Sequence, residues 1–243
     1  MLRNNLFALA FTAATLAVVP AANAQSTGDI AFTSFNSDED GFSLVTFVDL
    51  APGTTIFFRD DEWSGSSFNT GEGMHTWNSG ASIISAGTVV RFSAVDSAAR
   101  SASVGTISST GDTGLNATTE TIYAYLGSNV DTPTTFLAGI SSEGSTNLTP
   151  AGLTNGSNAV VVTNSTDYAV YTGPRSGATA FADYRSQVNN SANWSILVGG
   201  SQEGQIPNIT PFTITAVPEA GALAQMIAGV TILGFAARRR RNS

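Results

Sequence analysis

The sequence contains no cysteine, no lysine and a single histidine among its 243 residues. Without cysteine, no disulfide can hold the fold, although exported domains often depend on such bonds. Without lysine, Schiff-base and amine-nucleophile chemistry are excluded. The folded part must therefore be held together by buried apolar surface or by bound cations.

The one histidine, His75, lies between Met74 and Thr76 in a segment predicted to be a strand. A Ser-His-Asp triad or a zinc site would have to use it, and no Gly-x-Ser-x-Gly turn surrounds any serine. We therefore predict a structural or simply exposed His75 in a protein that is not an enzyme. Hydrolysis by paired carboxylates stays open, because the sequence gives no separations between acids.

The first 24 residues have the composition of a secretory signal peptide. Arg3 supplies the positive charge, and residues 6–19 form an apolar run. Ala22 and Ala24 are the small residues that a signal peptidase reads, which predicts cleavage before Gln25. The alternative is an uncleaved N-terminal anchor, for which the apolar run is short.

The C-terminal tail, residues 217–241, has three parts in a fixed order. They are the motif Val217, Pro218, Glu219 and Ala220, an uncharged and mainly apolar run over 221–237, and a cluster of Arg238, Arg239, Arg240 and Arg241. A helix over 221–237 would span about 26 Å, enough for a thin bilayer. The arginines would hold their end in the cytoplasm, with the preceding domain outside the inner membrane. An ordinary C-terminal anchor would look the same.

This order of parts resembles the PEP-CTERM sorting signal, in which a Val-Pro-Glu-Pro-like motif precedes a short transmembrane helix and an arginine cluster. The match departs at Ala220, where the family has a second proline. The resemblance implies a Gram-negative bacterium that makes exopolysaccharide, and an exosortase that cuts near the motif. The protein would pass through an inner-membrane intermediate to the cell surface or the extracellular space.

Between the two targeting segments, residues 25–216 are long enough for one domain with a sizeable core. This part carries five Arg against seventeen Asp and Glu, a net charge of −12. A domain this acidic repels phosphate backbones, so we expect no nucleic-acid partner.

Short runs rich in Val, Ile, Thr, Phe and Tyr alternate with Gly, Asn, Asp and Ser clusters, which predicts an all-β fold, a single β sandwich. The first strand is apolar on both faces, so we expect it to be buried on both sides. One helix is expected at 178–188, and 97–119 is expected to be a surface loop or weak edge strands. The expected strands are 29–35, 42–49, 54–60, 74–77, 88–94, 121–126, 135–140, 159–163, 169–171 and 194–198.

Four short segments of the domain carry a second resemblance, at 28–32, 49–56, 60–63 and 71–73. They are similar to uncharacterised exported bacterial proteins that are distantly related to lamin-tail-like β sandwiches. The resemblance implies a lamin-tail-like or Ig-like sandwich and no particular activity.

Two acidic turns are the candidate metal site, with Asp38 and Asp40 in one and Asp60 and Asp61 in the other. Calcium takes six to eight oxygen ligands, which turns at the edge of a sandwich can supply. The spacing matches no calcium-loop pattern, so acidic solvated turns are the alternative.

The aromatic residues Trp63, Trp77 and Trp194, with Phe68, are candidates for a sugar-stacking platform, and burial in the core is the interpretation we favour. The sequence as a whole favours a non-enzymatic surface or matrix protein associated with exopolysaccharide. The alternatives are a carbohydrate- or calcium-binding module and, third, a secreted hydrolase that uses paired carboxylates.

Overall fold

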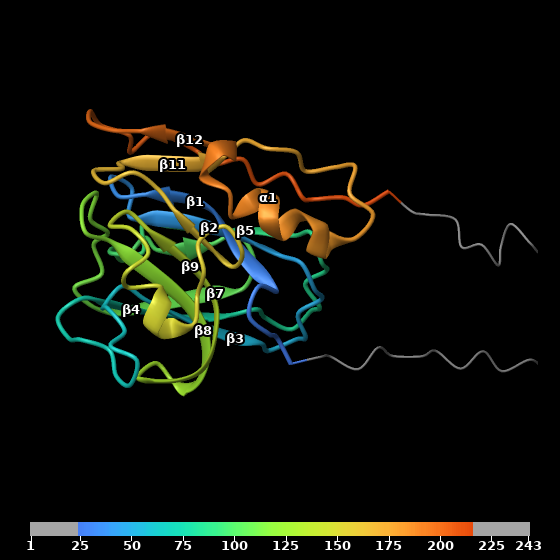
Figure 1. Ribbon diagram of the computed structural model, residues 1–243. Coiled ribbons are helices and arrows are strands. Elements are labelled where there is room, and N and C mark those ends of the chain that lie inside the picture. Colours follow the sequence, from blue (N-terminus) through green and yellow to red (C-terminus); the bar gives the residue numbers. More distant parts are fainter. Residues whose placement is uncertain (1–23, 216–243) are drawn as a thin grey trace, which may run out of the picture.

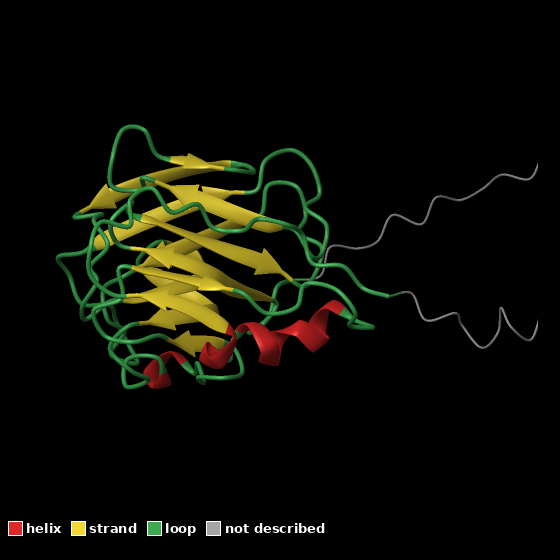
Figure 2. Ribbon diagram, turned by 90° about the horizontal axis from the view of Figure 1, so that it is seen from above, coloured by secondary structure: helices red, strands yellow, loops and turns green. Residues whose placement is uncertain are grey.

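The computed structural model describes residues 24–215, so most of the expected signal peptide and the whole sorting tail lie outside the described residues. Two six-stranded sheets pack face to face and confirm the β sandwich (Figure 1, Figure 2). In the described part of the chain, no helix is long and apolar enough to cross a membrane.

The first sheet has its longest strand, β1, near its middle. Its order is β12 (Trp194–Leu197), β11 (Tyr168–Tyr171), β1 (Ile30–Asn36), β2 (Gly41–Thr46), β5 (Val89–Ser93) and β6 (Ser101–Ala102). All pairings are antiparallel. Every residue of β1 is buried, as its two apolar faces predicted, because one face meets the second sheet and α1 (Arg185–Val188) packs against the strand.

The second sheet contains one parallel pairing, between its outermost strand β10 and β9. Its order is β10 (Ala159–Val161), β9 (Thr132–Ser141), β8 (Thr121–Asn129), β3 (Thr55–Arg59), β4 (Gly73–Asn78) and β7 (Thr106–Gly111). The short β6 and the exposed β7 lie at sheet edges within 97–119, which confirms the expected weak edge strands.

Short helices complete the structure. They are the 3-10 helices η1 (Thr149–Ala151), η2 (Phe181–Tyr184) and η3 (Ser191–Asn193), besides α1. The helix expected at 178–188 forms over η2 and α1. The first residues of the expected helix are extended instead, because Ala178 forms a β-bridge with Ile214 near the C-terminal end of the described chain.

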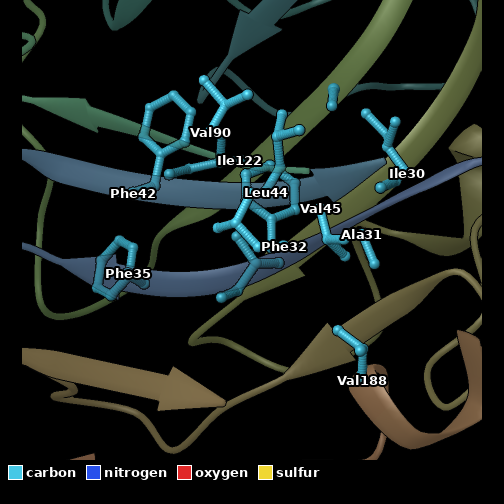
Figure 3. Close-up of a cluster of buried hydrophobic side chains, with 14 of the residues drawn as sticks. Ile30, Ala31, Phe32, Phe35, Phe42, Leu44, Val45, Val90, Ile122 and Val188 are labelled. Atoms are coloured by element: carbon cyan, nitrogen blue, oxygen red, sulfur yellow. The ribbon is translucent and has the colours of Figure 1, made fainter. Parts of the chain in front are cut away.

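Aromatic rings from both sheets fill the centre of the sandwich. Phe42 lies 4.9 Å from both Phe58 and Phe92 by ring centroids, and 5.8 Å from Phe32. Figure 3 shows Phe42 with Val90 and, from the second sheet, Ile122. Each such ring pair contributes about 0.5–1.5 kcal/mol beyond the burial of its area.

A second apolar cluster covers the outer face of the second sheet. Tyr123 and Tyr125 are fully buried there beneath Leu148 and Leu153, with partly buried Phe57, Trp63, Phe68 and Phe136 around them. The other two tryptophans, Trp77 and Trp194, are buried in the main core, so the expectation of core tryptophans is confirmed for them. Trp63 is half-buried at the rim of the second cluster.

The C-terminal strap, defined as residues 206–215, is tied down by one buried ring. Phe212 is 2 % exposed, stacks on Tyr171 and meets Tyr184 edge to face. Its N–H donates to the carbonyl of Gly87, and the N–H of Thr215 donates to Ala178, both at 2.8 Å. Both ends of the described chain leave the sandwich on the same side (Figure 1, Figure 2).

Candidate acidic site

The turn that follows β3 turns one carboxylate into the sandwich and the next toward the outer face. Strand alternation points Phe58 and Asp60 inward and Arg59 outward, onto the ring of Phe68. Arg59 pairs with Tyr123 across the sheet, and this is the last pair of β3 with β8 in this direction. Asp60 follows β3 and Glu120 precedes β8, so both acids lie at the same end of the sheet, where the charge of Asp60 contributes to raising the pKa of Glu120.

Gly73, the first residue of β4, leaves room for this inward carboxylate. A Cβ at Gly73 would lie 3.1 Å from Oδ2 of Asp60 and 3.0 Å from the carbonyl oxygen of Asp112. The same Cβ would lie 2.9 Å from Cα of Thr113, closer than real Cβ atoms come, so a residue larger than glycine would displace the loop that begins at Asp112.

The closing loop, residues 112–120, covers this end of the core from one sheet to the other. The N–H of Leu115 donates to Oδ1 of Asp40 at 2.6 Å, in the β1–β2 turn. The next N–H, of Asn116, donates to Oε2 of Glu120 at 2.7 Å. Two residues of the loop itself, Thr113 and Leu115, are buried. The two acidic turns that the sequence singled out thus lie at the same end of the sandwich, on either side of this loop.

Within residues 24–215, no arginine forms an ion pair with Asp60 or Glu120. Burial, with the charge of Glu72, raises the pKa of Asp60 to about 8. Burial, with the charges of Asp60 and Glu72, raises the pKa of Glu120 to about 9. One oxygen of each, Oδ1 of Asp60 and Oε1 of Glu120, is buried without a hydrogen-bond partner. Both carboxyls are therefore protonated at neutral pH.

Asp61 differs from its neighbour because an arginine neutralises it. Nε of Arg59 donates to Oδ2 of Asp61 at 2.8 Å, and the N–H of Glu72 donates to its Oδ1 at 3.2 Å. A second nitrogen of Arg59 meets the exposed Asp131 at 2.6 Å. Asp61 consequently serves to hold Arg59 and the turn before β4.

A shallow, open hollow lies outside the buried pair. Its lining residues are Asp61, Glu62, Phe68, Asn69, Thr70 and Glu72. Glu72 is half-buried, and burial, followed by the charges of Glu62 and Asp61, raises its pKa to about 7. Three of the six residues that line the hollow are thus acids, and none is basic.

The other two aspartates predicted as metal ligands lie in the β1–β2 turn of the first sheet. Oδ2 of Asp38 accepts the N–H of Gln202 at 2.5 Å. Burial raises the pKa of Asp40 to about 6, and the charge of Asp96 adds to this. The structure thus places the four predicted residues in two turns on opposite sheets. Among residues 24–215, no three His, Asp or Glu side chains form a ready-made metal cage.

The sequence did not single out Glu72 and Glu120, although a signal for both was present. Each precedes an expected strand by one or two residues, in the same way that Asp60 ends one. In an antiparallel sheet the end of one strand lies beside the starts of its neighbours, and the alternation of each strand sets which side chains face inward. What the sequence could not give is which strands are neighbours.

His75 is buried on the inward face of β4. Its Nδ1 lies 2.8 Å from Oγ of Ser109, and its Nε2 has no partner. Burial and the charge of Arg100 lower its pKa to about 4, so the ring is neutral. No carboxylate orients the ring, and the pair therefore lacks the third member of a catalytic triad.

Comparisons of the chain with protein-family models, with curated proteins and with solved structures found no match. The geometry of the acidic end and the sequence of the two terminal segments are therefore the basis for a functional proposal.

Proposed function

We propose that this is an exported, non-enzymatic protein of the cell surface or extracellular matrix, associated with exopolysaccharide. The observation that carries the proposal is the placement of the two ends of the described chain. They leave the sandwich together, and the turn between β1 and β2 and the loop between β3 and β4 lie on the opposite side (Figure 1). A domain held at the membrane by its tail would thus direct its acidic end outward.

The route follows from the terminal segments. A signal peptidase removes the first 24 residues, with Ala22 and Ala24 at the site and Gln25 as the new N-terminus. The helix over 221–237 holds the chain in the inner membrane as an intermediate, until an exosortase cuts near Val217. Since Phe212 fixes the strap to the core, such a cut leaves the sandwich closed. The released domain goes to the cell surface or the medium.

In this proposal the sandwich is of the lamin-tail-like or Ig-like kind, as the segments at 28–32 and 49–56 imply. The burial of Asp60 and Glu120 supports a non-enzymatic role. A glycoside hydrolase needs one ionised and one protonated carboxyl in contact with the sugar. Asp60 and Glu120 are both protonated at neutral pH and both covered.

The hollow beside Glu72 gives a second candidate function, a carbohydrate-binding module. Asn69 and Thr70 offer polar groups for sugar hydroxyls, and the half-buried Trp63 packs on Phe68 at 4.9 Å between ring centroids. Aromatic faces beside polar side chains suit the apolar and hydroxyl-bearing faces of a sugar ring. Polysaccharide of the producing cell is the ligand that the sorting tail suggests.

The export route is tested by expressing the chain in a Gram-negative host with and without an exosortase. We expect a mature protein that begins at Gln25 and ends near Val217, identified by intact mass, only when the exosortase is present. A variant in which serine replaces Arg238 to Arg241 should accumulate in the wrong orientation or unprocessed. Release of the same product without an exosortase would contradict the proposed route.

A further inference from the structure

Large apolar side chains that stay exposed gather near the C-terminal end of the described chain. Of the six such residues within 24–215, five fall between positions 197 and 214. Single exposed apolar side chains are ordinary on a protein surface, whereas their concentration in one short segment marks a surface that contacts something apolar. The five are Leu197, Val198, Ile206, Ile209 and Ile214.

Three of the five belong to the C-terminal strap, which contains no charged residue. Ile206 is 73 % exposed, Ile209 45 % and Ile214 41 %. Two other residues of the strap, Pro207 and Phe212, are buried, and hydrogen bonds to Gly87 and Ala178 fix its backbone. The isoleucines are therefore held on the outside by an ordered segment that is anchored in the core.

An arginine that no acid balances lies beside the strap. Nη1 of Arg175 donates to the carbonyl of Thr210 at 2.8 Å, and its guanidinium carbon lies 4.8 Å from the ring centroid of Phe212. Within residues 24–215 Arg175 forms no ion pair, and its Nη2 is buried without a hydrogen-bond partner. Exposed isoleucines beside an unpaired cation set this side apart in a domain with a net charge of −12.

The strap leads directly to the segment that the proposed function places in the inner membrane, and the inference rests on that proposal. The strap runs to the point where the chain leaves the sandwich (Figure 1). The described chain ends at Thr215, and the expected helix begins at Gly221. The connection between these two residues spans at most about 22 Å when fully extended. An attached tail therefore keeps the end of the strap close to the lipid.

We propose that the C-terminal strap and Arg175 rest on the outer surface of the inner membrane while the tail is attached. The isoleucines enter the boundary between headgroups and acyl chains, where apolar side chains are favoured. Arg175 meets the phosphate groups of anionic lipids, for which a guanidinium is well suited. Ile214 is nearest the tail in sequence, so the contact is strongest there and weakens toward Ile206. This contact would hold the sorting motif at 217–220 at a fixed distance from the bilayer.

A bilayer suits the strap better than a second copy of the chain. A stable protein interface buries about 800 Å² on each partner and involves about 20–30 residues a side. The strap is a segment of only ten residues, with three exposed isoleucines. Because the tail holds the strap beside the lipid, the contact is intramolecular in effect, and a small apolar surface is then sufficient.

The experiment uses single cysteines, which a cysteine-free chain allows without background labelling. The full-length chain carries a bimane label at Ile209→Cys or Ile214→Cys. It is reconstituted in vesicles of phosphatidylcholine and phosphatidylglycerol that contain a brominated quencher lipid. Val198→Cys is the matched control, an exposed apolar residue whose neighbour Leu197 pairs with Tyr168 at the end of the sheet near the β1–β2 turn. A label at Ile232→Cys, in the expected helix, reports whether the tail is inserted.

We expect lipid quenching at least about twofold stronger at Ile209 and Ile214 than at Val198, because only the strap contacts the bilayer. Arg175→Gln should weaken the quenching at Ile209 in the mixed vesicles and leave it unchanged in phosphatidylcholine alone, since the attraction requires anionic lipid. Unchanged urea unfolding of this variant shows that the strap stays in place.

Equal quenching at Ile209 and Val198, with Ile232 quenched, would overturn the inference and leave the membrane anchor intact. A label at Ile209 that is shielded only at high protein-to-lipid ratio would also overturn it, by placing a second copy of the chain on the strap. Absence of quenching at Ile232 would refute the anchor itself, and the inference with it.

Discussion

The free energy of unfolding is expected to fall as the pH rises from about 6.5 to about 8.5. In the unfolded chain, Asp60 and Glu120 titrate near pH 4. In the folded protein, burial raises their pKa values to about 8 and about 9. The folded state therefore keeps two protons that the unfolded state has released, and rising pH favours unfolding until both folded pKa values are passed.

The magnitude follows from the length of that window. Each proton of difference changes the free energy of unfolding by about 1.4 kcal/mol per pH unit. Asp60 keeps its proton over about 1.5 units and Glu120 over about two, which gives an upper limit of about 5 kcal/mol. Entry of water to the ionised groups reduces this. We expect a loss of about 2 kcal/mol, equivalent to a fall in Tm of about 4–8 °C in a domain of this size.

The assay is urea unfolding of the full-length chain in detergent, followed by tryptophan fluorescence across this pH range with EDTA present. The double variant Asp60→Asn with Glu120→Gln should lose the pH dependence, because neither replacement titrates. Asp131→Asn, which changes an exposed acid beside Arg59, should keep it. A wild-type stability that stays constant or rises over this range would refute the protonated state of the buried pair, and with it the electrostatic reasoning.

Three further predictions concern the strap, the histidine and the outer aromatic cluster. Phe212→Ala should lower the free energy of unfolding by about 3–5 kcal/mol in urea titrations, whereas Ala at the exposed Ile206 should change it by less than about 0.5 kcal/mol. Burial lowers the pKa of His75 to about 4, so the free energy of unfolding should fall as the pH drops from about 6.5 to about 4. His75→Gln should reduce this fall in the same urea titrations, because glutamine does not titrate. Trp63→Ala should reduce retention on exopolysaccharide of the producing strain while its fluorescence-detected unfolding stays cooperative; retention equal to wild type would exclude the carbohydrate-binding candidate. Trp77→Ala should instead lose about 3–5 kcal/mol of stability.

The strands were predictable because each carries its own local signal. Runs such as 42–49 and 88–94 alternate β-branched or aromatic residues and end at glycine or aspartate turns, and they form β2 and β5. The run at 29–35 carries apolar residues on both faces of the strand, and this local pattern predicted that β1 is fully buried. In 97–119, Ser, Thr and Gly leave little apolar surface to bury, so β6 and β7 form only by pairing at sheet edges.

The pairing of strands, and therefore the site, could not be predicted in the same way. Asp60 and Glu120 are sixty positions apart, and the antiparallel pairing of β3 with β8 brings them to the same end of the sheet. The sequence instead linked Asp60 with Asp61, which alternation turns to the opposite face and Arg59 neutralises. Acidic turns were thus found by composition, whereas the burial of Asp60 and Glu120 depends on which strands pair and in which register.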